Sequence, residues 1–187
     1  MDVELDGRYA FSLAFDIASE LRRGQALSEA EIGDLHRRDI VYGAVERAIR
    51  LLTYRPRSRA EVSRHLIEKG FDPDVAEATC NHLERLDYLD DSKFASWWVD
   101  NRMEHRPRGC FALRSELRAR GVAAEHIAAA VENVDEFPGA IRLAAKIADR
   151  HRHLSRAEFE KVVGAHLQRR GFTRESILRA VEHAFAS

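Results

Sequence analysis

The stretch RPRSRAEVSRHLIEKGF, residues 55–71, has the form of a short helix bounded at both ends. Pro56 restricts the residue before it to extended backbone, so the preceding helix must end at this joint. Ser58 and Glu61 have the spacing of a capping box, in which each side chain bonds the backbone amide of the other residue. Gly70 suits the left-handed conformation that commonly terminates a helix. We therefore predict one helix between Ser58 and Gly70.

This pattern occurs three times, with helix-ending glycines at positions 70, 121 and 171, spaced by 51 and then 50 residues. Apolar residues stand eight and four positions before each glycine, which is the spacing of one helix face. These pairs are Val62 and Leu66, Leu113 and Leu117, and Val163 and Leu167. Apolar residues one and ten positions after each glycine predict a further helix beyond the turn.

Another helical pattern precedes each joint, around residues 44–52, 94–98 and 141–147. Each repeat therefore contains three helices, and a self-similar period of roughly 45 to 50 residues indicates tandem modules. We predict a mainly α fold of three tandem three-helix modules, each resembling a helix-turn-helix unit. The predicted modules span residues 41–88, 89–134 and 135–187.

The later repeats vary the pattern. RPRG at residues 106–109 repeats RPRS, and Gly109 takes the cap position that serine holds in the first repeat. Ser155 with Glu158 restores the capping-box spacing in the third repeat. The distance from the cap to the glycine is 16 residues there and 12 in the first repeat, so we predict a helix one turn longer.

Residues 1–40 form a different segment. VELDGRYAFSL alternates around Asp6 and Gly7, a two-residue turn of hairpin type, and Ser28 has the position of a helix cap. We predict a small N-terminal β-hairpin and a helix. An isolated hairpin is marginally stable in water, so it should lean on the first module.

The composition and charge of the chain exclude several classes of protein. No apolar run reaches the length of a transmembrane helix and the N-terminus is acidic, so we expect a cytoplasmic protein without membrane contact. Cys80 and Cys110 lack metal-site or disulfide-scaffold spacing and are expected to be free thiols. Residues 1–40 carry nine acids against five bases, whereas the remainder carries 22 acids against 25 bases, so the body is mildly basic.

No pattern indicates an enzyme. His151 and His153 are two residues apart and point to different helix faces, so we expect no metal site. Asp90 and Asp91 precede a helix, where acids complement the helix N-terminus, and this is favoured over acid-base chemistry. A phosphate-binding loop of the GxxxxGK[ST] type is absent. We therefore expect no catalytic residues and no cofactor.

Two further features have competing interpretations. Trp97 and Trp98 could stack nucleic-acid bases, but with Phe94 they fit a core-facing helix stripe, which we favour. Tandem helix-turn-helix units could bind DNA directly through the third helix of each module. That helix is not basic in the first two modules, which argues against such a role. A purely structural helical adaptor remains a third class.

Basic residues gather instead on the joints and the second helices. Six arginines lie between positions 102 and 120, and eight bases lie between 142 and 170. Any one of them can be an ordinary solvated side chain, but their clustering favours a surface for acidic protein patches, DNA phosphates, or both. The candidate partner-binding residues are Arg55, Arg57, Arg106, Arg108, Arg114, Arg118, Arg169 and Arg170.

The chain resembles a known family in the order of its motifs. LDDSKFASWWVDNR, residues 89–102, followed by RPRGCFALRSELRARGV, residues 106–122, resembles the second module of the RecX family of bacterial RecA regulators. YRPRSRAEVSRHLIEKGF at 54–71 is similar to that family's first module, and HLQRRGFTRESILRAV at 166–181 to its third.

The resemblance implies an elongated, curved, monomeric array of helices that binds the groove of the RecA filament on single-stranded DNA. Such a protein limits filament extension, promotes disassembly, and restrains recombination, DNA repair and the SOS response. It has no catalysis of its own. Weak direct DNA contact is compatible with this role.

Overall fold

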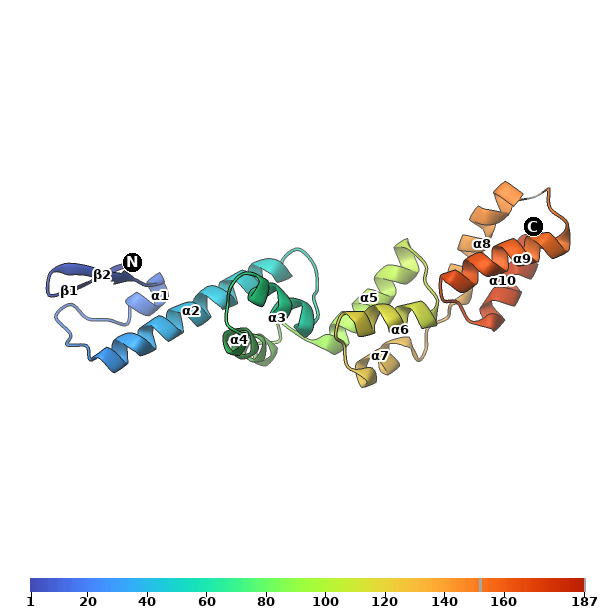
Figure 1. The fold of residues 1–187 in the computed structure, drawn as a ribbon. Helices are drawn as coiled ribbons and strands as arrows, with labels where there is room; N and C mark the ends of the chain where they lie inside the picture. Colours follow the sequence, from blue (N-terminus) through green and yellow to red (C-terminus); the bar gives the residue numbers. More distant parts are fainter. Residues whose placement is uncertain (152, 187) are drawn as a thin grey trace. The chain divides into compact units, whose positions relative to one another are not determined.

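The computed structural model describes residues 1–151 and 153–186, which form ten helices and one two-stranded hairpin (Figure 1). The elements are β1 (Asp2–Leu5), β2 (Arg8–Ser12), α1 (Phe15–Ala18), α2 (Glu29–Leu52), α3 (Arg59–Glu68), α4 (Pro73–Arg85), α5 (Asp91–His105), α6 (Cys110–Ala119), α7 (Ala124–Val131), α8 (Phe137–His151), α9 (Arg156–Arg169) and α10 (Arg174–Ala186). The mainly α fold with a small N-terminal hairpin is confirmed. The chain divides into two compact units, Met1–Leu89 and a second that begins at Asp90.

The N-terminal hairpin has the predicted two-residue turn. Asp6 and Gly7 both have positive φ, 52° and 75°, as a type I′ turn requires. The hairpin contributes Val3 and Phe11 to a small apolar cluster around Leu35 of α2. The hairpin thus packs on the helix that also builds the first module.

Helix α2 is continuous across position 40. It begins at a capping box, where the Glu31 amide donates to Ser28 Oγ at 3.3 Å and the Ser28 amide donates to the Glu31 carboxylate at 2.7 Å. Leu35, near its start, belongs to the N-terminal cluster, whereas Ala44 and Ala48 are fully buried in the first module. One helix therefore serves both the N-terminal segment and the module.

The first module packs α2, α3 and α4 around the apolar positions that the repeat identified. Val62 and Leu66 of α3 are fully buried against Cys80 and Leu83 of α4. Ser58 Oγ accepts the Glu61 amide at the start of α3, as predicted, at 3.2 Å. The helix spacing in the sequence therefore identified the core face correctly.

Each repeat glycine ends its helix in a Schellman motif. Gly70, Gly121 and Gly171 have φ values of 91°, 77° and 80°. In the first repeat the Gly70 amide donates to the Ile67 carbonyl and the Phe71 amide to the Leu66 carbonyl. The same pair of bonds recurs after α6 and after α9. These bonds satisfy carbonyls that a helix end would otherwise leave free.

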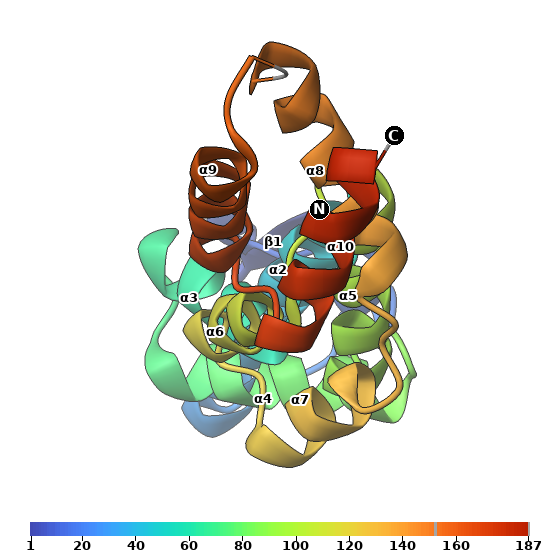
Figure 2. The same ribbon diagram turned by 90° about the vertical axis from the view of Figure 1, so that its right-hand side faces the viewer.

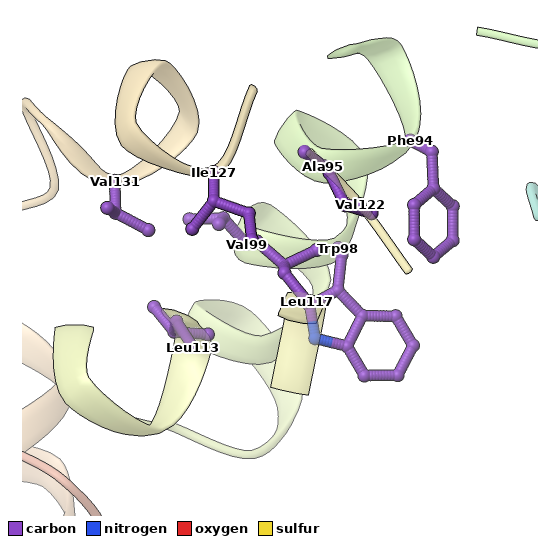
Figure 3. Packing of buried hydrophobic residues seen from close by; sticks show 9 residues of the cluster. All are labelled: Phe94, Ala95, Trp98, Val99, Leu113, Leu117, Val122, Ile127 and Val131. Atoms are coloured by element: carbon purple, nitrogen blue, oxygen red, sulfur yellow. The ribbon is translucent and has the colours of Figure 1, made fainter. Parts of the chain in front are cut away.

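The second module packs α5, α6 and α7 around Phe94, Leu113 and Leu117 (Figure 3). Trp98 lies in this core with 6% of its surface exposed, and Trp97 packs against it from a half-buried position. The structural interpretation of the two tryptophans is confirmed. The buried Trp98 indole is not an open platform for stacking bases.

The third module packs α8, α9 and α10 around a common core. Figure 2 shows these three helices from the side that faces right in Figure 1. Val163 and Leu167 of α9 are fully buried there with Ala144 of α8 and Ala180 of α10. Helix α9 has 14 residues, against ten in α3 and in α6. The predicted extra turn is therefore confirmed.

The second and third modules meet through backbone atoms. The Gly109 amide donates to the Arg170 carbonyl at 3.0 Å, and the Phe111 amide donates to the Gly171 carbonyl at 3.1 Å. A Cβ atom on Gly109 would lie 2.1 Å from the Gly171 oxygen, and one on Gly171 would lie 2.4 Å from the Ala112 nitrogen. The change from serine to Gly109 in the second repeat therefore allows direct contact with the third module.

Glu136 completes the junction between these modules. Its carboxylate, 4% exposed, accepts the Cys110 amide, the Thr173 amide at 3.0 Å and the Thr173 hydroxyl at 2.7 Å. Burial alone would raise the pKa of Glu136, yet the hydrogen bonds from Cys110 and Thr173 outweigh burial and hold that pKa below its usual value. One carboxylate therefore caps the starts of both α6 and α10.

Replacing Gly109 by alanine should destabilise the protein by about 1 to 3 kcal/mol, because the added methyl group overlaps the backbone at Gly171. The matched control is Gly43→Ala in α2, where a Cβ would meet nothing within 4 Å. Alanine there lowers the conformational entropy of the unfolded chain and so favours the folded state. That control should gain about 0.4 to 1 kcal/mol. Urea unfolding measures both changes. Equal stability of the two variants would contradict the close backbone contact.

Glu136→Gln should lower the free energy of unfolding at pH 7 by about 1 to 3 kcal/mol, since it replaces a charged acceptor of three hydrogen bonds. Because the folded-state pKa of Glu136 is depressed, its contribution is fully present above pH 4.5, the ordinary value, and is lost as pH falls below it. Urea unfolding at several pH values should show wild type and variant converging in acid. A constant difference down to about pH 2 would contradict this assignment.

Candidate partner-binding surface

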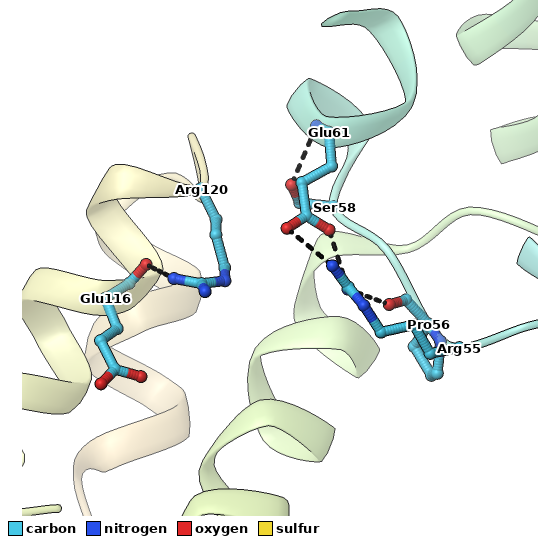
Figure 4. A network of polar contacts seen from close by, with 6 residues as sticks. All are labelled: Arg55, Pro56, Ser58, Glu61, Glu116 and Arg120. Atoms are coloured by element: carbon cyan, nitrogen blue, oxygen red, sulfur yellow. Dashed lines mark hydrogen bonds and ion pairs between the residues drawn. The ribbon is translucent and has the colours of Figure 1, made fainter. Parts of the chain in front are cut away.

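One of the two arginines in the first joint forms hydrogen bonds within the first module. The Arg55 guanidinium donates to the Glu61 carboxylate at 2.9 and 3.2 Å and to the Pro56 carbonyl at 2.7 Å (Figure 4). These bonds tie the extended joint to the first turn of α3. Arg55 is therefore held as a support of the joint, with 31% of its side chain exposed.

Arg57 has no such neutralising contact. Its side chain is half-buried, and its Nε has no hydrogen-bond partner within the described residues. Burial, followed by the neighbouring charge of Arg55, lowers the pKa of Arg57, and Glu61 only partly offsets them. Arg57 thus carries a partly desolvated charge, which an anionic group on a partner would stabilise.

Side chains from α5 and from the second joint contact Glu116 of α6. Its carboxylate accepts a hydrogen bond from Arg102 at 2.7 Å and one from the Trp98 indole at 3.0 Å. Arg108 approaches the other oxygen at 3.2 Å. Glu116, 20% exposed, therefore offsets the charge of two arginines and satisfies the one polar atom of the buried indole.

Two guanidinium groups also lie against the Trp98 ring. Arg120 lies 3.6 Å from the ring centroid and Arg102 lies 4.2 Å from it. Arg120 in addition donates to the Glu116 carbonyl at 2.7 Å (Figure 4). Cation–π contacts of this kind fix the tryptophan and align the end of α6 with α5. Arg102 and Arg120 are thus structural members of the second module.

Further basic side chains lie on α6 and on the joint that precedes it. Arg114 is half-buried and Arg118 exposed, and the four-residue spacing places both on one side of α6 while Leu113 and Leu117 face the core. Arg106 is exposed on the joint. In the described part of the chain Arg106, Arg114 and Arg118 make no ion pair.

The junction brings a second basic pair to this region. The Arg170 carbonyl accepts the Gly109 amide, so the backbones of Arg108 and Arg170 lie next to each other. Arg169 is exposed and Arg170 half-buried at the end of α9. Burial lowers the pKa of His166, and the charges of Arg170 and Arg169 lower it further. Arg108 and Arg170, far apart in sequence, are therefore neighbours in the fold.

The third helices of the first two modules, α4 and α7, differ from this basic surface in their charge. On α4, Glu77 and Glu84 bind Arg59 at 2.5 and 2.7 Å, so these acids fix α3 to α4. Helix α7 contains Glu125 and neither lysine nor arginine. These surfaces do not have the charge that approach to DNA phosphates requires.

The acidic residue and the cysteines considered for other chemistry lie in structural positions. Asp90 caps α5 by accepting the amides of Ser92 and Lys93 at 2.8 and 3.0 Å, and the Lys93 amide is the main cause that lowers the pKa of Asp90. Cys80 and Cys110 are buried thiols that form no disulfide among the described residues, as predicted. Across residues 1–151 and 153–186, no group of three metal-type ligands occurs and no helix is long and apolar enough to cross a membrane.

The sequence did not reveal three of these residues. Glu116, Arg120 and Glu136 were not recognised as organising groups, because their partners lie on other helices or in another module. One signal was available for Glu136. Gly109 replaces a capping serine, so the second repeat lost its own cap and needed an acceptor from elsewhere.

Fold and surface together define a helical protein of tandem three-helix modules, with basic side chains that make no ion pair among the described residues. Two family models match it: "RecX, first three-helix domain" at residues 44–83 and "RecX, second three-helix domain" at residues 90–131. The regulatory protein RecX of Bacillus subtilis (strain 168) is 31% identical over 186 residues, covering 97% of this chain and 70% of that protein. That of Bacillus licheniformis is 30% identical, covering 97% and 71%. The chain belongs to the RecX family of regulatory proteins.

Solved structures show the same fold. A crystal structure of regulatory protein RecX has a TM-score of 0.82 at 24% identity, covering 97% of this chain and 92% of that one. RecX from Lactobacillus salivarius has a TM-score of 0.72 at 22% identity, covering 80% and 99%. The architecture is therefore maintained at low sequence identity.

Glu116→Ala should destabilise the protein by about 1 to 3 kcal/mol, because it leaves the Trp98 indole and two arginines without their acceptor. Tryptophan emission should shift to longer wavelength as water reaches Trp98. Glu104→Ala is the control, since that carboxylate is 76% exposed and lies 3.9 Å from the His105 imidazole. Unchanged emission and unfolding midpoint in the Glu116 variant would contradict the structural role.

Proposed function

We propose that this protein binds RecA assembled on single-stranded DNA and limits extension of the filament. Membership of the RecX family supports a regulatory role directed at RecA. Within this proposal the protein acts in the cytoplasm as a monomer, without cofactor or catalysis. Recombination, DNA repair and the SOS response are the processes that it would restrain.

The observation that carries the proposal is the unpaired basic face on α6. Arg114 and Arg118 share that face without an ion pair among the described residues, and neither is required by the core. A charged surface of this kind accelerates encounter with an anionic partner and selects against cationic ones. A filament of protein on DNA offers both carboxylates and phosphates.

The proposed contact residues fall into two groups. Arg57, Arg106, Arg114, Arg118, Arg169 and Arg170 are proposed to face the partner. Arg55 and Arg108 are proposed to act through the joints, because Glu61 and Glu116 already hold them. Substituting these two would change binding by moving the joints.

The modular architecture suits a polymeric partner. A filament presents the same surface at regular intervals, and three linked modules that each bind weakly gain effective concentration along it. The repeated RPR joint then places equivalent arginines at equivalent positions of each module that carries it. Affinity would come from the linked set rather than from any one site.

Direct binding to duplex DNA through the third helices is the alternative function. The helix-turn-helix geometry favours it, whereas the acidic character of α4 and α7 opposes it. Weak contact of the basic face with DNA phosphates is compatible with the main proposal. The two functions differ in which helix matters.

Arg114→Glu combined with Arg118→Glu should reduce inhibition of RecA filament growth and ATP turnover at least about tenfold while changing stability by less than about 0.5 kcal/mol. Inhibition by wild type should also weaken as salt rises, since exposed charges are screened. Filament length on single-stranded DNA and ATP hydrolysis measure the effect. Circular dichroism checks the fold.

The control places charges on the rival helix. Ala124→Glu with Ala128→Glu has the same four-residue spacing on exposed positions of α7 and should leave inhibition nearly unchanged. If this pair abolishes activity while the Arg114/Arg118 pair inhibits like wild type, the recognition-helix function replaces the proposed one. If both pairs inhibit like wild type, neither surface is the contact.

A further inference from the structure

The third module departs from the repeat at two adjoining positions. The residues seven and six before the helix-ending glycine are Ser63 and Arg64 in α3, and Gly164 and Ala165 in α9. The equivalent pair in α6 is Arg114 and Ser115. Helix α9 thus carries only a glycine and an alanine at these two positions.

The second module also departs from the repeat, at one position. The residue two after the cap is Ala60 in the first module and Ala157 in the third, but Phe111 in the second. Phe111 is 64% exposed, so the core of its own module does not require the ring. A large apolar side chain held in water where the repeat accepts alanine indicates a surface that meets something else.

These departures lie together in one groove of about 720 Å³, the α6–α9–α10 groove. Its lining includes the apolar side chains of Phe111, Phe172 and Ile177 and the small residues Gly164 and Ala165. The junction between Gly109 and Gly171 fixes the two sides, because the Phe111 amide itself bonds the Gly171 carbonyl. The groove is therefore a preformed feature of the second unit.

The rim of the groove is positively charged. Glu160 is bound by Arg156 at 2.9 Å, so its charge is compensated. Lys161 on α9 and Arg174 on α10 also line the groove and make no ion pair among the described residues. An occupant that is apolar in its centre and acidic at its edges would complement this arrangement.

We propose that the α6–α9–α10 groove binds an acidic, apolar segment of a protein partner. An aliphatic or aromatic side chain of that segment sits over Gly164 and Ala165 against Phe111, and its flanking carboxylates pair with Lys161 and Arg174. The inference rests on the proposed function in one respect, namely that RecA within the filament supplies this segment. An apolar lining flanked by two basic side chains suits a protein side chain better than a run of phosphates, which needs a longer track of positive charge.

The first test uses a peptide and no RecA. The probe is a fluorescein-labelled 14-residue amphipathic helix with leucines on one face and glutamates flanking them, measured by anisotropy against the full chain. We expect saturable binding that weakens at least tenfold in Gly164→Gln, which fills the groove, and in Lys161→Glu combined with Arg174→Glu. The same peptide with glutamine in place of glutamate should bind more weakly, and oligo(dT) should not compete.

Matched controls separate the groove from general effects. Gly43→Gln makes the same change on an open face of α2, and Lys146→Glu with Arg150→Glu makes the same charge reversal on exposed positions of α8. Both should bind the peptide within about twofold of wild type. Absence of peptide binding by wild type, equal losses in groove and control variants, or displacement by oligo(dT) would overturn the inference.

The second test measures affinity for RecA filaments with the same variants, together with Phe111→Ser and its control Leu178→Ser, an exposed apolar residue outside the groove. Losses of at least tenfold confined to the groove variants support the inference. Wild type that binds the peptide but not the filament contradicts the proposed function and leaves the groove assignment supported. Wild type that binds the filament with groove variants unchanged overturns the assignment of RecA as the source.

Discussion

Three backbone amides at the start of α6 impose the constraint on which the second unit depends. A helix leaves its first amides without intrahelical acceptors, and in the first repeat the Ser58 side chain accepts one of them. Here Gly109, Cys110 and Phe111 donate instead to the Arg170 carbonyl, the Glu136 carboxylate and the Gly171 carbonyl. The second module is therefore completed by the third, and the two form one compact unit.

Local patterns predicted most of the fold because local forces determine it. The Schellman glycines, the turn at Asp6 and Gly7, the caps and the extra turn of α9 each depend on residues close in sequence. The Glu136 contacts join residues 26 and 37 positions apart, so no short pattern contains them. Gly109 was correctly placed at a cap, but its reason lies in a backbone from another module.

The sequence predicts where the basic surface lies, but not which of its arginines lack an acidic partner. Clustering identified the joints and second helices, whereas tertiary contacts determine which charges are compensated. Glu116 offsets Arg102 and Arg108, and Glu61 offsets Arg55, so these arginines are parts of the scaffold. Counting charges along the sequence treats all of them alike. Only the side-chain geometry separates Arg114 and Arg118, which lack such partners in the described residues.

A repeat protein reveals specialised positions through departures from its own pattern. All copies must satisfy the same requirements of helix packing. A residue that differs among them at an exposed position therefore reflects a requirement other than packing. Phe111 and Gly164 differ in this way, and both line one groove although they belong to different modules. The junction formed by Gly109, Glu136 and Gly171 holds the two walls together. The same contact that makes two modules into one unit therefore also creates a surface that neither module has alone.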